Sequence, residues 1–286
     1  MSNKPLISFD YAIKYLLKNK TDYDIVEGFI SALLNSCGYK SIKIKSLLES
    51  ESSRENNLLK RSVADLIVED EDGNNYIVEI DRSTTDLFLN KAVFNTSRLI
   101  VDSINSEQDY SNIKKVFHIN LLYFPLRGIK SPLYHDNVIF HEVDKEHPTD
   151  IHLIDRSMKT FDAYNIFPEY FVISIPLFND VIKKEIDEWL YMLKHSSIKD
   201  DFKSPYMKKV AKRLSVLMMN PQERRKYDEY IMDSLKKRDY IVTAREEGRN
   251  DKAIDIARNM LALGINIETI SKATMLSIEE IKRLYM

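Results

Sequence analysis

Two short segments, residues 66–68 and 76–80, are almost wholly apolar, and an acidic turn that contains a glycine joins them. This pattern predicts two antiparallel strands of a β-hairpin. With a turn made of residues 71–73, Asp65 lies directly opposite Glu79. The pattern therefore predicts two carboxylates face to face where the strands meet.

A third acid, Asp81, shares the face of Glu79 because side chains alternate along a strand. Carboxylates this close repel one another, and a cation between them offsets the repulsion. Hard oxygen ligands suit Mg²⁺ or Mn²⁺. The alternative is a solvated acidic face, or a register slipped by two residues. Ile67 and Ile77 lie on the same face and favour a partly apolar wall around the acids.

Hydrophobic periodicity elsewhere predicts an α/β chain with a mixed sheet, the hairpin at its centre and an almost wholly helical region from residue 179. The expected elements are two helices within 8–36, a strand at 41–48, a helix at 86–104, strands at 115–124, 138–143 and 170–175, and a helix at 181–194. Gly248 predicts a break, followed by short helices at 251–263, 267–273 and 277–284. The predicted domains are residues 1–178, 179–248 and 249–286.

Composition narrows the class of protein. The 286 residues are 44% hydrophobic, which is normal for a globular chain. A single cysteine, Cys37, excludes a disulfide framework within the chain and fits a reducing compartment. Without a signal peptide or an apolar run of membrane-spanning length, we expect a cytoplasmic protein with no membrane partner. The net charge of −2 gives no support of its own to nucleic-acid binding.

The acids resemble the signature of PD-(D/E)XK nucleases, in which an aspartate opens one strand and Glu-x-Lys or Glu-x-Gln closes the next. Here the residues are Asp65 and then Glu79-Ile80-Asp81. The wider chain is similar to the Rpn group of recombination-promoting nucleases, also called PD-(D/E)XK nuclease family transposases. The similar stretches are residues 9–14, 29–35, 188–190, 257–264 and 278–281.

The resemblance implies a restriction-endonuclease-like core followed by an all-helical C-terminal region. It implies that Asp65, Glu79 and the Ile80 carbonyl bind Mg²⁺ or Mn²⁺, whose bound water attacks a DNA phosphodiester. It also implies DNA breakage that promotes recombination or mobile-element transfer.

Two residues depart from the family pattern. Ala64 replaces the proline before the first aspartate, and Asp81 replaces the lysine or glutamine of the motif. An anion cannot stabilise charge developing on phosphorus as a lysine does. Asp81 therefore ligates a second metal ion or marks an inactive site, and a cation from Lys60, Arg82 or Lys91 is the further alternative.

The resemblance adds residues around this site. Acids of two early helices, Asp10 and Glu27, are candidates for completing the metal site, and the alternative for each is a solvated helix acid. Lys91 is a candidate for support. Three basic residues are candidates for DNA binding: Lys60, Arg82 and Arg98.

Two rival functions stay open. One is a catalytically degenerate nuclease fold kept as a DNA-binding or protein-interaction module, and the other is a hydrolase that acts on RNA. The final helices are helix-turn-helix-like, but the last one carries both Glu279 and Lys282. Homo-oligomer formation through these C-terminal helices is therefore an alternative to insertion into a DNA groove.

Overall fold

The computed structural model describes residues 6–12, 23–48, 64–82, 87–104, 109–126, 128–136, 138, 152–154, 160–162, 167–216 and 219–284. The chain divides into two compact units, Met1–Arg224 and Arg225–Met286. The finer division predicted at residues 178 and 248 stays a prediction.

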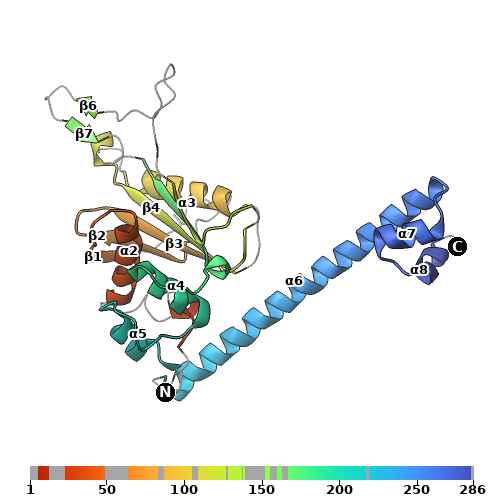
Figure 1. Ribbon diagram of the computed structural model, residues 1–286. Helices are drawn as coiled ribbons and strands as arrows, with labels where there is room; N and C mark the ends of the chain where they lie inside the picture. Colours follow the sequence, from red (N-terminus) through yellow and green to blue (C-terminus); the bar gives the residue numbers. More distant parts are fainter. Residues whose placement is uncertain are drawn as a thin grey trace. The chain divides into compact units, whose positions relative to one another are not determined.

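Figure 1 labels the helices and strands. The described elements up to residue 216 are α1 (Phe9–Tyr11), α2 (Asp24–Ser36), β1 (Ile44–Leu48), β2 (Leu66–Asp70), β3 (Asn75–Asp81), α3 (Phe88–Asp102), η2 (Tyr110–Asn112), β4 (Val116–Leu122), β5 (Leu133–Asp136), β6 (His152–Ile154), β7 (Thr160–Asp162), β8 (Glu169–Ser174), η4 (Ile175–Leu177), α4 (Glu185–His195) and α5 (Met207–Arg213). The remaining helices are α6 (Pro221–Ala262), α7 (Ile267–Thr274) and α8 (Ile278–Arg283).

Six strands form one mixed sheet in the order β1-β2-β3-β4-β8-β5. β3, β4 and β8 are parallel, whereas β1, β2 and β5 join by antiparallel pairing. Every residue of β4 is buried, as expected for a parallel strand covered on both faces. The mixed sheet with β3 in its interior confirms the predicted fold class.

The hairpin has the predicted register. Leu66 pairs with Val78 and Ile67 pairs with Ile77. Gly73 has a φ of 83°, a conformation that glycine adopts without the strain a side chain would bring. Continued by one residue, this register sets Asp65 opposite Glu79, so the turn chemistry correctly predicts which acids face each other.

Helices cover both faces of the sheet (Figure 1). On one face, Leu99 and Ile100 of α3 pack against Ile67 and Ile77 of the hairpin. On the other face, the Tyr39 ring that follows α2 meets Phe117 of β4 edge to face. The acids at odd-numbered positions of β3 share the face of Ile77, so α3 is the helix that covers them.

The α2 and α4 helices pack through aromatic rings. Trp189 is fully buried and meets the Phe29 ring at 5.9 Å between centroids. A Cβ at Gly28 would lie 2.4 Å from the Tyr206 ring, so only glycine allows this close approach. The single tryptophan is therefore a core residue.

One local prediction was wrong. The predicted break at Gly248 is absent, because α6 continues through it to Ala262. An exposed helical glycine costs only about 1 kcal/mol relative to alanine, and the neighbouring helix formers offset it. The strand expected at 138–143 stays a prediction, because residues 139–143 lie outside the described ranges, and the edge strand of the sheet is β5.

The second unit ends in two short helices around its own small core. Ala257, Ile270, Leu276 and Ile281 form this core. Ser277 caps α8 through a reciprocal bond with Glu280, as its sequence predicts. The short α7, the three-residue turn and α8 give the helix-turn-helix-like arrangement that the sequence predicts.

Candidate active site

Glu79 is a fully buried carboxylate near the carboxyl end of β3. Two side chains of α3, four residues apart, hold its two oxygens. Asn95 donates a hydrogen bond to Oε1, and the Lys91 ammonium lies 2.7 Å from Oε2. Burial raises the pKa of Glu79, and the charge of Asp81 adds to the rise. The Lys91 ammonium and the Asn95 carboxamide counteract it. A buried acid whose pKa stays raised despite these partners is typical of a functional site.

The Lys91 ammonium also lies 3.6 Å from Asp81 Oδ1. Burial lowers the pKa of Lys91, but its bond to Glu79 and the charges of Asp81 and Asp65 outweigh burial and raise it. Within the described ranges, no three His, Cys, Asp or Glu side chains are grouped as ligands of one ion. Glu79 and Asp81 share the Lys91 ammonium, one of the three cations that the sequence offered.

Asp65 lies just before β2 and turns toward β3. Its Oδ2 accepts a hydrogen bond of 2.8 Å from the Ile80 backbone N–H. The N–H and C=O of a strand residue point to the same side, so the Ile80 carbonyl also points toward Asp65. The structure thus brings together Asp65, Glu79, Ile80, Asp81 and Lys91.

A second polar layer beside Glu79 was missed by the sequence reasoning. Asn120 of β4 is the register neighbour of Glu79, and His118 is the neighbour of Ile77. His118 Nδ1 lies 2.8 Å from the Thr96 hydroxyl, and burial, with the charge of Lys91, lowers its pKa to about 3. The signal in the sequence was the alternation of His118 and Asn120 within an otherwise apolar strand.

Asp10 and Arg82 bind each other. Arg82 donates two hydrogen bonds of 2.6 Å to the carboxylate of Asp10, which is fully buried. The guanidinium also lies 4.7 Å from the centre of the Tyr123 ring. The expectation of a solvated acid at Asp10 is wrong, because this bidentate pair ties α1 to the residue that follows Asp81.

Glu27 is not brought to the other acids. Its carboxylate accepts hydrogen bonds from Lys43 at 2.6 Å and from the Ile44 N–H at 3.0 Å. Ile44 pairs with Asp70, at the turn end of the hairpin, whereas Asp65 lies at the opposite end. Glu27 is buried rather than solvated, and it fastens α2 to β1.

Arg98 and Lys60 are the two remaining residues that the sequence predicts as DNA contacts. Arg98 of α3 pairs with Asp102 at 2.8 Å along the same helix. Lys60 lies outside the described residues. The structure therefore places Arg98 in a local ion pair on α3.

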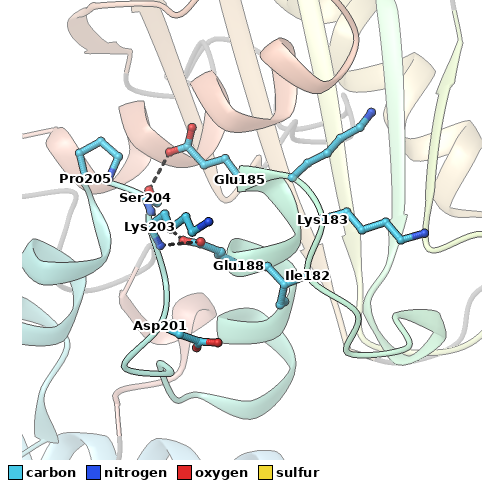
Figure 2. Close-up of a pocket in the computed structure, with 9 residues that line it drawn as sticks. Ile182, Lys183, Glu185, Glu188, Asp201, Lys203, Ser204 and Pro205 are labelled. Atoms are coloured by element: carbon cyan, nitrogen blue, oxygen red, sulfur yellow. Dashed lines mark hydrogen bonds between the residues drawn. The ribbon is translucent and has the colours of Figure 1, made fainter.

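A cleft of about 380 Å³ lies beside α4 and the segment before α5 (Figure 2). Two of the acids that line it, Glu185 and Glu188, already have partners. Glu188 accepts hydrogen bonds from the backbone N–H groups of Lys203 and Ser204, and Glu185 accepts one from the Ser204 hydroxyl. These bonds fasten the segment before α5 to α4. Glu188, which lies in one of the stretches that resemble the family, therefore has a structural role here.

Residues 7–244 match a family model described as PD-(D/E)XK nuclease family transposase. The chain belongs to this family. Residues 250–286 match the C-terminal HTH domain of the Rpn/YhgA-like nuclease family. Searches of curated proteins and of solved structures gave no match.

Membership in the PD-(D/E)XK nuclease family confirms the resemblance, the fold class and a nuclease-type function. The HTH match confirms the helix-turn-helix prediction for the last helices and points to DNA as a partner. None of the described helices, the 42-residue α6 included, is apolar enough over a sufficient length to cross a membrane.

Proposed function

We propose that this PD-(D/E)XK family member is a metal-dependent endonuclease that hydrolyses DNA phosphodiester bonds and thereby promotes recombination or mobile-element transfer. The observation that carries the proposal is the burial of Glu79 between Asp65 and Asp81 at the carboxyl end of a central parallel strand. Ligands of open α/β sheets bind at the carboxyl ends of the strands.

The carboxylate oxygens around Glu79 are donors of the kind that a divalent cation prefers. Asp81 Oδ2 is buried, and no described residue donates a hydrogen bond to it. Asp65, Glu79 and the Ile80 carbonyl would hold Mg²⁺ or Mn²⁺ as hard oxygen ligands, with Asp81 as a further ligand. When bound, such an ion supplies a water of lowered pKa for attack on phosphorus.

The chain's own residues orient this site. Asn95 fixes Oε1 of Glu79, so the carboxylate presents Oε2 toward Asp81 and Lys91. Lys91 supplies the positive charge that position 81 lacks, and its ammonium stabilises charge on the scissile phosphate. In the family pattern the lysine follows the glutamate on the same strand, whereas Lys91 belongs to α3.

Each of the two units has candidates for contact with DNA. Arg82 and Arg98 stay candidates for phosphate contact, although Asp10 and Asp102 offset their charge. Lys60 stays a candidate from the sequence alone. The HTH region supplies a second DNA-binding element, and pairing of its helices between two copies of the chain stays a prediction.

A degenerate nuclease fold is the second candidate, and the observation that favours it is Asp81 itself. An anion stands where the family motif has lysine or glutamine, and a lysine is ion-paired to the acids. In that case the protein binds DNA or a protein partner without cutting.

Nicking of supercoiled plasmid tests the proposal. The purified protein is incubated with Mg²⁺, Mn²⁺ or EDTA beside Asp65→Asn, Asp81→Asn and the control Asp136→Asn at an exposed acid of β5, with a single-stranded RNA as a parallel substrate. We expect metal-dependent nicking of DNA that falls at least about 10³-fold in Asp65→Asn and is unchanged in the control.

The Asp81→Asn rate distinguishes a carboxylate that assists from one that hinders. Absence of nicking with every metal would establish the degenerate fold instead. Cutting of the RNA but not of the plasmid would assign the RNA hydrolase.

A further inference from the structure

The position of the Lys91 ammonium has a consequence for metal binding. Its Nζ lies between two carboxylates, 2.7 Å from Glu79 and 3.6 Å from Asp81. Asp65 lies near enough for its charge to act on the same group. The ammonium therefore lies where the charges of three carboxylates act on it, and those charges would also stabilise a divalent cation.

The two oxygens of Glu79 have different partners. Oε1 accepts its hydrogen bond from the Asn95 carboxamide, on the same helix as Lys91. Oε2 faces Lys91, and the hydrogen-bonded Oε1 is the less available of the two. A metal ion that uses Glu79 as a ligand is therefore expected at Oε2.

Lysine and metal compete for that oxygen. Mg²⁺ demands short bonds of about 2.0–2.1 Å in a near-octahedral arrangement, and an ammonium within hydrogen-bonding distance of the same oxygen would repel it. The Lys91 side chain is 42% exposed, whereas Glu79 is fully buried. The lysine head is thus the member that can move, because its flexible four-carbon stem lets it turn toward solvent.

We propose that Lys91 is an exchangeable internal cation, which neutralises Glu79 and Asp81 in the metal-free protein and is displaced from them when a divalent ion binds. This inference rests on the proposed function, since it takes the same carboxylates as the metal ligands. It goes further by assigning a cost to metal binding: the ion pair of Lys91 must break before Glu79 Oε2 becomes available.

Calorimetric titration with Mn²⁺ tests the exchange without reference to cutting. The full-length parent, Lys91→Met and Asp65→Asn are titrated at one pH and one salt concentration. Methionine keeps an apolar stem of similar length and removes the charge. We expect Lys91→Met to bind Mn²⁺ about 10-fold more tightly than the parent, because no ion pair has to be broken first.

Lys45→Met is the matched control. Lys45 is an exposed lysine in an ion pair of 2.7 Å with Glu69, and its loss should leave Mn²⁺ affinity unchanged. Lys91→Gln repeats the test with a polar neutral side chain, and thermal unfolding of each variant verifies that it is folded.

The outcomes separate the two proposals. Equal affinity in the parent and Lys91→Met, with binding lost in Asp65→Asn, would overturn the exchange and leave the metal site standing. Weaker binding in Lys91→Met would show that the lysine supports Glu79 as a ligand, which also overturns the exchange. Absence of Mn²⁺ binding in both the parent and Lys91→Met would overturn the metal site and the exchange together.

Discussion

Two buried glutamates of the same sheet have opposite surroundings. Glu79 lies near the carboxyl end of β3, and Glu169 lies at the start of β8 on the other face. Glu169 accepts hydrogen bonds from Lys115 at 2.6 Å and from the Tyr39 hydroxyl at 2.8 Å, and His135 Nε2 lies 2.7 Å from it. The groups around Glu169 are cationic or neutral donors, whereas Glu79 has two further carboxylates as neighbours.

The two glutamates also differ in the direction of their pKa shifts. Burial would raise the pKa of Glu169, but the bonds from His135, Lys115 and Tyr39 outweigh burial and lower it. Burial raises the pKa of Glu79, and its two partners do not fully offset that rise. A buried carboxylate with saturated bonding stabilises the fold, whereas one that has further carboxylates as neighbours is suited to bind a cation.

The largest expected effect on stability is at Glu169. Glu169→Gln leaves the Lys115 ammonium, which is only 7% exposed, without its anionic partner. We expect a loss of about 3–5 kcal/mol in the free energy of unfolding, measured by urea titration. Glu79→Gln should instead raise that free energy by about 1 kcal/mol, since it relieves repulsion among acids. Equal losses in both variants would contradict the contrast.

A smaller effect is expected from the residue that orients Glu79. Asn95→Ala removes the hydrogen bond to Oε1, so Mn²⁺ affinity should fall about 10–100-fold, as for other residues that position metal ligands. Calorimetric titration measures it. Tyr39→Phe, which removes one hydrogen bond from Glu169, is the control and should cost about 1 kcal/mol of stability without changing Mn²⁺ affinity. Unchanged metal affinity in Asn95→Ala would contradict the positioning role.

The smallest effects are in the pH dependence of stability in metal-free buffer. The folded-state pKa of Glu169 is lowered from 4.5, so its stabilisation is present above that value and is lost as the pH falls through the lowered pKa. The folded-state pKa of Glu79 is raised from 4.5, so its ionisation costs stability as the pH rises through the raised pKa.

Urea titrations from acid to neutral pH should therefore give opposite trends. The deficit of Glu169→Gln relative to the parent should shrink toward acid pH, and the advantage of Glu79→Gln should grow toward neutral pH. Parallel curves for the two variants would show that the two glutamates do not differ in this way.

The hairpin was predictable because its information is local. A turn of three residues containing Gly73 fixes the register, and the register sets Asp65 opposite Glu79. The same alternation correctly placed Ile67 and Ile77 on the acids' face.

The surroundings of the acids were not predictable in the same way. The contacts of Lys91 and Asn95 with Glu79 depend on how α3 crosses β3, which no local pattern specifies. Glu27 was misjudged for the same reason, because its partner Lys43 becomes a neighbour only when α2 packs beside β1. Local periodicity gives the strand faces, whereas tertiary packing decides which charges meet.

The most direct test of the account is the rate of plasmid nicking per mole of folded protein for the parent, Glu79→Gln and Glu169→Gln. The rates are compared with Mg²⁺ at a temperature where all three are folded. The account predicts that Glu79→Gln loses at least about 10³-fold, while the less stable Glu169→Gln stays within about twofold of the parent. Equal rates for the parent and Glu79→Gln, or an equal loss in both variants, would contradict the assignment of Glu79 as the metal-binding carboxylate.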